Sequence, residues 1–246
     1  MMISGKDSDA VSVLRLWRAR NISHFDMKLF SQGDYLRCMQ EENEAEVISK
    51  VLYPADDHYE GKSLRLKQQY FLVSASLQNI ISDHKHRYGP LDKLPQLAAI
   101  HINDTHPALA IPEMMRILMD ENGFTWDDAW NITTGVFAYT NHTVMAEALE
   151  TWQEDLIARR LPRIHMIIKE INRRFCEQLW ARFPGQHALI DSMSVISNGQ
   201  IKMANLSVIG SHKVNGVSAL HSDIIKNSIF NGFYQLWPDK FTNVTN

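Results

Sequence analysis

Cysteine is scarce in this chain of 246 residues, which contains only Cys38 and Cys176. Two unlinked thiols in a long chain argue against a disulfide framework and indicate a reducing compartment. Long apolar runs are missing too, since no stretch reaches the roughly 18 apolar residues of a membrane-spanning helix. The start, MMISGKDSDAV, lacks the apolar core and the cleavage site of a signal peptide. These absences predict a cytoplasmic protein with no membrane contact.

The chain also lacks an excess of positive charge. Its 25 Lys and Arg residues face 28 Asp and Glu residues, for a net charge of −3. No basic stripe interleaved with aromatic residues occurs, so the sequence gives no reason to expect nucleic-acid binding. Neither G-x-G-x-x-G nor a Walker loop is present, which removes the common nucleotide-binding fingerprints.

What remains is an ordinary globular composition, with 45% hydrophobic residues, in which strand patterns alternate with helix patterns. This alternation predicts an α/β fold with a largely parallel, Rossmann-like layered sheet. Strands are expected at 98–102 and 135–139, and Asn198-Gly199 predicts a hairpin turn. The expected helices are 31–40, capped by Ser31, then 43–52, 62–86, 107–120 with a kink or restart at Pro112, 125–134, 161–183 and 217–227. The six tryptophans and the MMRILM segment are expected to lie in the core.

Both ends of the chain read as strands without a visible partner. Residues 11–17 (VSVLRLW) alternate as in a strand, yet no earlier segment predicts a pairing strand. Residues 241–246 (FTNVTN) form a second strand pattern that stops abruptly. Because open edge strands invite aggregation, the simplest interpretation is that the chain is part of a longer one.

Two polar clusters follow predicted strands and carry the candidate chemistry. In HINDTHP (101–107) a strand leads into Asp104 and His106, and in AYTNHT (138–143) a strand leads into Asn141 and His142, followed by a helical pattern. Parallel strands end at one edge of a sheet, where ligands bind in α/β folds. We therefore expect both clusters to face one crevice. The alternative is that Asp104 and Thr105 merely cap the next helix.

Other groupings support weaker hypotheses. Glu147 and Glu150 could act as an acid and base pair, although three residues apart on one helix they are more typical of a solvated face. His101, Asp104 and His106 could ligate a metal in a hydrolase, but three converging ligands cannot be read from this spacing alone. The polar loop at 53–61 is either a solvated turn or a mobile gate over a pocket.

Several stretches resemble one family in sequence and in order. They are LRLW, VLYPADDHYEGKSLRLKQQYF, HINDTHPALAIPEMMRIL, WDDAWNITTGVFAYTNHTVMAEALETW, LPRIHMIIKEINRRF and SHKVNGVSALHS. The chain is similar from about residue 11 onward to the α-glucan phosphorylases, which are the glycogen and maltodextrin phosphorylases. The NDTHP and YTNHT blocks together are highly specific, and SHKVNG is closer to the bacterial glycogen phosphorylases.

The resemblance implies a glycosyltransferase of the two-domain GT-B type, with residues 1–246 as one partial domain from the later part of the N-terminal domain. It implies reversible phosphorolysis of α-1,4-glucan (glycogen or maltodextrin) by phosphate to α-glucose 1-phosphate. It also implies pyridoxal 5′-phosphate, whose phosphate takes part in proton exchange and whose anchoring lysine belongs to the other domain. The full-length family is typically homodimeric. We expect the fragment alone to be inactive, and a standalone glucan-binding module is the alternative.

The same resemblance assigns individual residues. His142 matches a histidine whose side chain contacts the glucosyl unit and whose main-chain carbonyl lies near the anomeric carbon, and Asp104 and His106 match residues that orient the sugar. Asp57 matches the tip of a gating loop, where animal enzymes usually carry asparagine. The remaining family sugar-site positions are Tyr139, Asn141, Thr143, Asn215, Val217 and Asn246.

One departure concerns regulation. Animal enzymes carry two arginines for the phosphate of AMP after the long helix, and this chain has Ser82 and Asp83 there. Activation by AMP through that site is therefore not expected.

Overall fold

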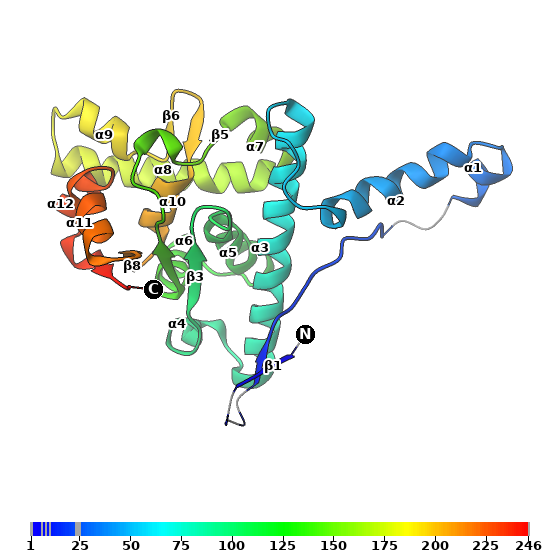
Figure 1. The fold of residues 1–246 in the computed structure, drawn as a ribbon, viewed down its shortest axis with the longest axis horizontal. Helices are drawn as coiled ribbons and strands as arrows, with labels where there is room; N and C mark the ends of the chain where they lie inside the picture. The colour runs from blue at the N-terminus through cyan, green and yellow to red at the C-terminus, as the bar shows by residue number, and fades with distance from the viewer. Residues whose placement is uncertain (1, 6, 8, 10, 23–25, 246) are drawn as a thin grey trace. The chain divides into compact units, whose positions relative to one another are not determined.

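The computed structural model describes residues 2–5, 7, 9, 11–22 and 26–245. The chain divides into two compact units, Met1–Ala75 and Ser76–Asn246. Figure 1 shows the ribbon with its helices and strands labelled.

The first unit begins with a short antiparallel pair. β1 (Met2–Ser4) pairs with β2 (Val11–Val13), with Ile3 opposite Ser12. The expectation that the strand at residue 11 has no partner was therefore wrong, because Met2–Ser4 supply one. The regular strand also ends at Val13 rather than continuing to residue 17.

Two helices follow, α1 (Met27–Ser31) and α2 (Tyr35–Lys50). Ser31 ends α1 instead of capping a helix, because aspartates take the capping positions. Asp26 Oδ1 accepts from the backbone N–H of Lys28 at 2.9 Å, and Asp34 Oδ1 accepts from Arg37 at 3.3 Å. The two helices expected at 31–40 and 43–52 are one continuous helix, since the stretch between them contains no Gly or Pro to break it.

The predicted long helix is confirmed as α3 (Tyr59–Tyr88). It starts three residues earlier than expected, where the backbone N–H of Gly61 donates to Nδ1 of His58 at 2.8 Å. The polar loop before it, which carries Asp57, is exposed.

The second unit is built on a four-stranded sheet, which confirms the predicted α/β class. Its strands are β3 (Ile100–Asn103), β4 (Phe137–Thr140), β8 (Lys213–Gly216) and β9 (Phe241–Asn243), and they lie in the order β3-β4-β8-β9. Every neighbouring pair is parallel. The final strand pattern thus finds its partner in β8, although the regular strand covers only its first three residues.

Helices connect and cover these strands. They are η1 (Leu91–Lys93), α4 (Leu94–Leu97), α5 (Ala110–Arg116), η2 (Ile117–Glu121), α6 (Trp126–Val136), η3 (Ala146–Ala148), α7 (Glu154–Arg160), α8 (Pro162–Arg182), α9 (His187–Met193), α10 (Met203–Gly210), α11 (Ala219–Asn227), α12 (Asn231–Leu236) and η4 (Pro238–Lys240). α10 contacts β4, and α11 contacts β8 and β9. Across the described part of the chain, no helix combines the length and the apolar character needed to cross a membrane.

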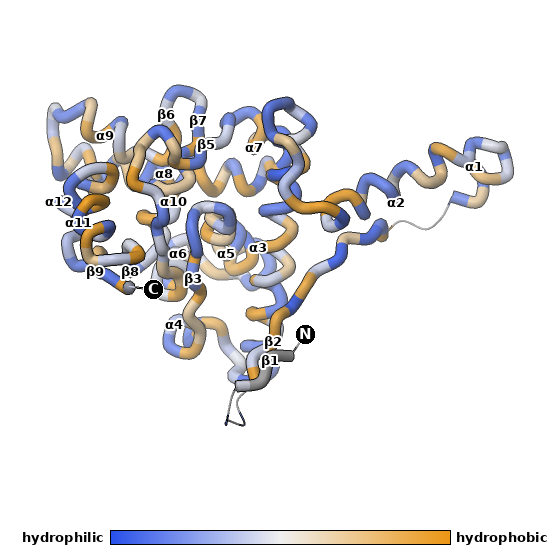
Figure 2. Tube along the Cα trace, viewed as in Figure 1, coloured by the Kyte–Doolittle hydropathy of each residue, from blue (hydrophilic) through white to orange (hydrophobic). Residues whose placement is uncertain are grey.

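Local sequence signals explain several of these helices. Thr125 caps α6 as predicted, because its Oγ1 accepts from the backbone N–H of Asp128 at 3.2 Å. Helix α5 begins only at Ala110, so Pro112 lies in its first turn, where the missing N–H costs nothing. Apolar and polar residues alternate along α8 with helical spacing, as Figure 2 shows, and its apolar side is buried.

A second, three-stranded sheet has the order β5-β7-β6. The predicted hairpin is confirmed between β6 (Ile196–Ser197) and β7 (Gln200–Lys202), because Asn198 and Gly199 have φ values of 50° and 70°. β5 (Thr151–Gln153) pairs with β7 and buries Trp152.

The helix expected after the YTNHT block does not form. Residues 141–145 are irregular, Ala146–Ala148 make a single 3-10 turn, and β5 follows. The physical reason is long-range: Trp152 fills the core opposite Ile201 of β7, and this burial requires extended backbone.

Candidate functional site

The register of the parallel sheet brings the two predicted polar clusters together. Asn103 of β3 lies opposite Thr140 of β4, and Thr140 lies opposite Asn215 of β8. The three strands therefore end at the same level. We call this edge, formed by residues 103–105, 140–143 and 215–217, the strand-end rim.

Direct hydrogen bonds join the clusters across the rim. Nε2 of His142 lies 2.6 Å from Oδ1 of Asn103, and the backbone N–H of Asp104 donates to the carbonyl of Thr140 at 2.9 Å. The prediction that both clusters share one edge of the sheet is confirmed. His142 is exposed, so its ring is held from one side and open on the other.

Asp104 adopts an unusual backbone conformation at this edge. Its φ is +61°, in the left-handed region that few residues other than glycine occupy. Its carboxylate accepts from the backbone N–H of Thr105 at 2.6 Å, and Thr105 donates its hydroxyl to Glu150 at 2.9 Å. Because the N-cap of α5 is Leu109, the interpretation that Asp104 and Thr105 cap that helix was wrong.

A buried layer of hydrogen bonds supports the exposed edge. Thr140 donates its hydroxyl to Oδ1 of Asn215 at 2.9 Å and also pairs with Nε2 of His101. The backbone N–H of Asn141 donates to the carbonyl of Asn215 at 3.0 Å. Each buried polar group of this layer thus has a partner, which fixes β3, β4 and β8 against one another.

Tyr139 belongs to this support rather than to the surface. It is fully buried, and its hydroxyl accepts from Nδ2 of Asn141 at 3.1 Å. Burial raises the pKa of Tyr139 well above its ordinary value, so the phenol stays protonated at every physiological pH. Asn141 in turn accepts from the backbone N–H of Thr143 at 3.0 Å and shapes the loop that presents His142.

Sequence reasoning missed His221, which ties the third strand to this loop. Its Nδ1 accepts from the backbone N–H of Val217 at 3.0 Å, and Nε2 lies 3.4 Å from the carbonyl of Thr143. The ring therefore carries its proton on Nε2. The only available signal was its position four residues after Val217, at the start of helix α11. Thr140 was likewise not singled out.

A comparison with protein families now adds to the geometry: the carbohydrate phosphorylase family matches residues 1–246. The chain belongs to the carbohydrate phosphorylase family. It is 46% identical over 244 residues to a glycogen phosphorylase of Bacillus subtilis, covering 99% of this chain and 30% of that protein. It is 48% identical over 236 residues to glycogen phosphorylase 2 of Dictyostelium discoideum, covering 95% and 24%. It is also 47% identical over 255 residues to the muscle form of glycogen phosphorylase from Ovis aries, covering 99% and 30%.

The phosphorylase chain thus spans about a third or less of the length of these relatives. The expected family is confirmed. The roles of individual residues stay predictions, and the structure adds where each residue lies.

Three of the predicted site residues lie outside the network of the rim. His106 is exposed, and its side chain has no hydrogen bond within the described part of the phosphorylase chain. Asp57 is exposed in the first unit, and Asn246 lies outside the described residues. Val217 is half-buried on the rim and contributes its backbone N–H to His221.

The competing hypotheses find less support in the geometry. His101 pairs with Thr140, and the described residues contain no group of three His, Cys, Asp or Glu side chains placed to hold a metal. Glu147 and Glu150 do not share a helix, and Glu150 accepts from Thr105 instead. The expectation of a paired helical face was therefore wrong.

Gly216, at the end of β8, lies so close to His221 and Ser222 of α11 that a substitution there gives a first test. A Cβ on Gly216 would lie 2.8 Å from Nδ1 of His221 and 2.9 Å from the backbone nitrogen of Ser222. We expect Gly216→Ala to push α11 away from β8, to lower stability by about 2 kcal/mol and to weaken ligand binding at the rim. Thermal unfolding and maltooligosaccharide titration of the full-length protein would measure both.

The control for this test is a second substitution. A Cβ on Gly216 would also lie 2.8 Å from Oγ of Ser222. Adding Ser222→Ala removes this hydroxyl but leaves the backbone nitrogen and Nδ1 of His221, and it also loses the hydrogen bond to Asn243, so it should restore no more than part of the lost stability. An unchanged melting temperature in Gly216→Ala would contradict the packing described here.

Proposed function

We propose that the protein containing this chain is a glycogen phosphorylase, a glycosyltransferase that catalyses reversible phosphorolysis of α-1,4-glucan to α-glucose 1-phosphate. The observation that carries the proposal is the strand-end rim, where His142 contacts Asn103 and Asp104 contacts Thr140 at the ends of β4 and β3. It stands in a chain that matches glycogen phosphorylases at about 46% identity over nearly its whole length.

The chemistry of the rim suits a sugar ring. Its polar side chains are amides, hydroxyls, an imidazole and one carboxylate, and such groups pair with hydroxyls in well-defined directions. We assign His142 and Asp104 to the orientation of the glucosyl unit, with His106 beside them. The main-chain carbonyl of His142 supplies a dipole toward the positive charge that grows at the anomeric carbon. Asn141, Thr143, Asn215 and Val217 complete the sugar site, with Tyr139 supporting it from below.

The cofactor is proposed to be held elsewhere in the protein. Pyridoxal 5′-phosphate in this family supplies a phosphate group that exchanges protons with the substrate phosphate. The rim offers no amine for a Schiff base: Lys213, on the strand β8, donates to the carbonyl of Asp239. In this proposal the anchoring lysine lies in another part of the protein, and the residues of this chain bind and orient the sugar.

The larger assembly follows from the same proposal. We place residues 1–246 as one partial domain in the N-terminal part of a GT-B enzyme, with the active site between two domains. Asp57 belongs to the gating loop, and Asn246 contacts a glucose hydroxyl. The full-length protein is a cytoplasmic homodimer that acts on glycogen or maltodextrin with phosphate.

The decisive assay measures the release of glucose 1-phosphate. The full-length protein should release it from glycogen only when inorganic phosphate is present, and residues 1–246 alone should release none. Release of free glucose without phosphate would refute the proposal in favour of a hydrolase. A fragment that binds maltooligosaccharide tightly, in a protein without phosphorolysis, would establish the binding-module alternative.

A further inference from the structure

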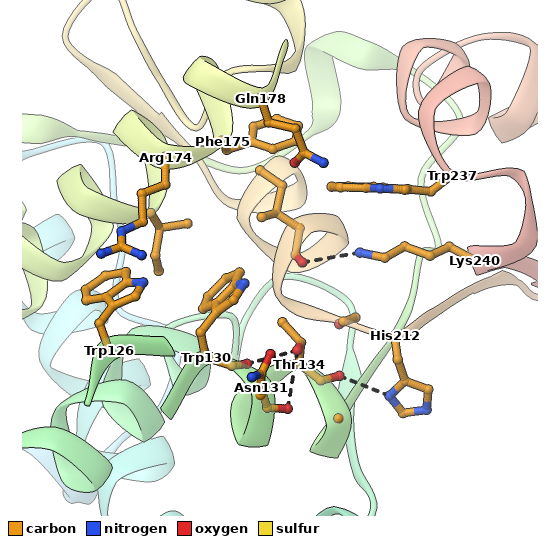
Figure 3. A pocket seen from close by; sticks show the side chains of 14 residues that line it. Trp126, Trp130, Asn131, Thr134, Arg174, Phe175, Gln178, His212, Trp237 and Lys240 are labelled. Carbon is orange, nitrogen blue, oxygen red and sulfur yellow. Dashed lines mark hydrogen bonds between the residues drawn. The ribbon is translucent and has the colours of Figure 1, made fainter. Parts of the chain in front are cut away.

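A cavity lies at the opposite edge of the parallel sheet from the strand-end rim. Its volume is about 610 Å³, within the range of small-molecule sites. Thr134 and Gly135 enter it just before β4, Ser211 and His212 just before β8, and Lys240 just before β9. The amino ends of three strands thus form its floor, and we call it the amino-end cavity (Figure 3).

Its walls are flat and aromatic. Trp126 and Trp130 come from α6 and Trp237 from the turn after α12, and all three indoles are half-buried. The expectation that the six tryptophans lie in the core was wrong for these three and also for Trp180, which is 41% exposed. Phe175 of α8 adds a further ring. Figure 3 shows the indoles of Trp126 and Trp130 on one side and that of Trp237 on the other.

Several charged and polar groups of the lining are already engaged within the protein. Arg174 pairs with Glu170 and Asp127, each at 2.7 Å. Thr134 donates to the carbonyl of Trp130, and Nδ1 of His212 lies 3.3 Å from the carbonyl of Thr134. The side chains of Asn131 and Gln178 also line the cavity and have no hydrogen bond among the described residues, so they add neutral polar contacts beside the aromatic walls.

Two groups suit one anionic substituent. Oγ of Ser211 is buried and has no hydrogen-bond partner among the described residues, which is unusual for a buried hydroxyl. Nζ of Lys240 donates to the carbonyls of Val208 and Ile209 at 2.9 and 3.3 Å and lies 4.0 Å from the ring centre of Trp237.

The charge of Lys240 is not neutralised by the protein. Among the described residues, no carboxylate lines the cavity and none forms an ion pair with Lys240. Burial lowers the pKa of Lys240 to about 7. The two carbonyls at the C-terminal end of α10 explain why a cation sits there, but they leave a third N–H direction unused.

We propose that the amino-end cavity binds a small planar aromatic compound with a single anionic group, the ring held by the indoles and the anion by Lys240 and Ser211. Aromatic rings favour stacked or edge-on contact with indole. An anion beside a buried ammonium forms a charge-assisted hydrogen bond, which is stronger than a neutral one. Nothing in this proposal requires the reaction at the rim.

The first experiment compares a matched pair of probes on the full-length protein. Indole-3-acetate and its neutral amide, indole-3-acetamide, differ only in the charged group. At pH 6, isothermal titration should show the acid binding at least tenfold more tightly than the amide. Lys240→Met, which keeps the apolar stem, should remove this difference while leaving weak binding of the amide.

The second experiment varies the pH of the unmodified protein, so it does not disturb the packing of the cavity. The acid binds the protonated lysine, so its affinity should fall as the pH rises through the pKa of Lys240, by about fiftyfold between pH 7 and pH 9. Lys240→Arg keeps its charge over this range and should show no fall. The dissociation constant of the amide should not depend on pH in either protein.

Several outcomes would overturn the proposal. One is that the acid does not bind, and another is that the acid and the amide bind with equal affinity. A third is that the affinity for the acid falls with pH in Lys240→Arg as it does in the unmodified protein. If Lys240→Met does not fold, the pH series on the unmodified protein still decides.

Discussion

Replacing His142 with alanine in the full-length protein is expected to lower kcat/KM for glucan phosphorolysis about a hundredfold, equivalent to roughly 2.7 kcal/mol of transition-state stabilisation. The side chain is exposed and is held by Asn103 at 2.6 Å, so its loss removes the sugar contact that we propose without opening the core. The melting temperature should stay within about 2 °C of the unmodified protein, because exposed side chains contribute little to stability.

Two further variants separate a role at the site from a general effect. His86→Ala removes another exposed histidine, at the end of α3, and should leave activity unchanged. Asn103→Ala frees the imidazole of His142 without removing it, so we expect about a tenfold loss, mainly in kcat. If His142→Ala retained full activity, the assignment of the rim as the sugar site would fail.

The arrangement of the rim could be predicted because it depends on local order and a general rule. Apolar strands followed at once by Asp104 and His142 are visible in the sequence, and parallel strands must end at one edge of the sheet. The supporting layer could not be predicted in the same way. The bonds of Thr140 to Asn215, and of His221 to Thr143, join residues 75 and 78 positions apart. Only the folded register brings them together.

The errors in the helices have a similar cause. Residues 146–152 have helical propensity, yet burial of Trp152 against β7 imposes a strand. Tertiary packing outweighs propensities that differ by tenths of a kcal/mol per residue. The amino-end cavity was hidden for another reason. Its tryptophans come from α6 and the segment after α12, and composition alone cannot separate a core indole from one that lines a cavity.

Replacing Arg116 with methionine is expected to destabilise the second unit by about 3 kcal/mol. Glu113 is completely buried in α5, and the guanidinium of Arg116 contacts both of its carboxylate oxygens, at 2.7 and 2.8 Å. Without the arginine, a buried negative charge loses its main partner, and this penalty is much larger than that of a missing surface ion pair. The measurement is the midpoint temperature of the thermal unfolding transition of this unit, which should fall by roughly 6–10 °C.

A matched variant and a double variant make this interpretation specific. Arg173→Met breaks ion pairs with Glu170 and Glu177 on α8, but Arg173 is 53% exposed, so we expect a loss of no more than about 0.5 kcal/mol. Combining Glu113→Leu with Arg116→Met removes both charges, and most of the lost stability should return, because an apolar pair can replace a buried ion pair at little cost. If the double variant were as unstable as Arg116→Met alone, the loss would come from packing by the arginine stem, and the buried charge would not be its cause.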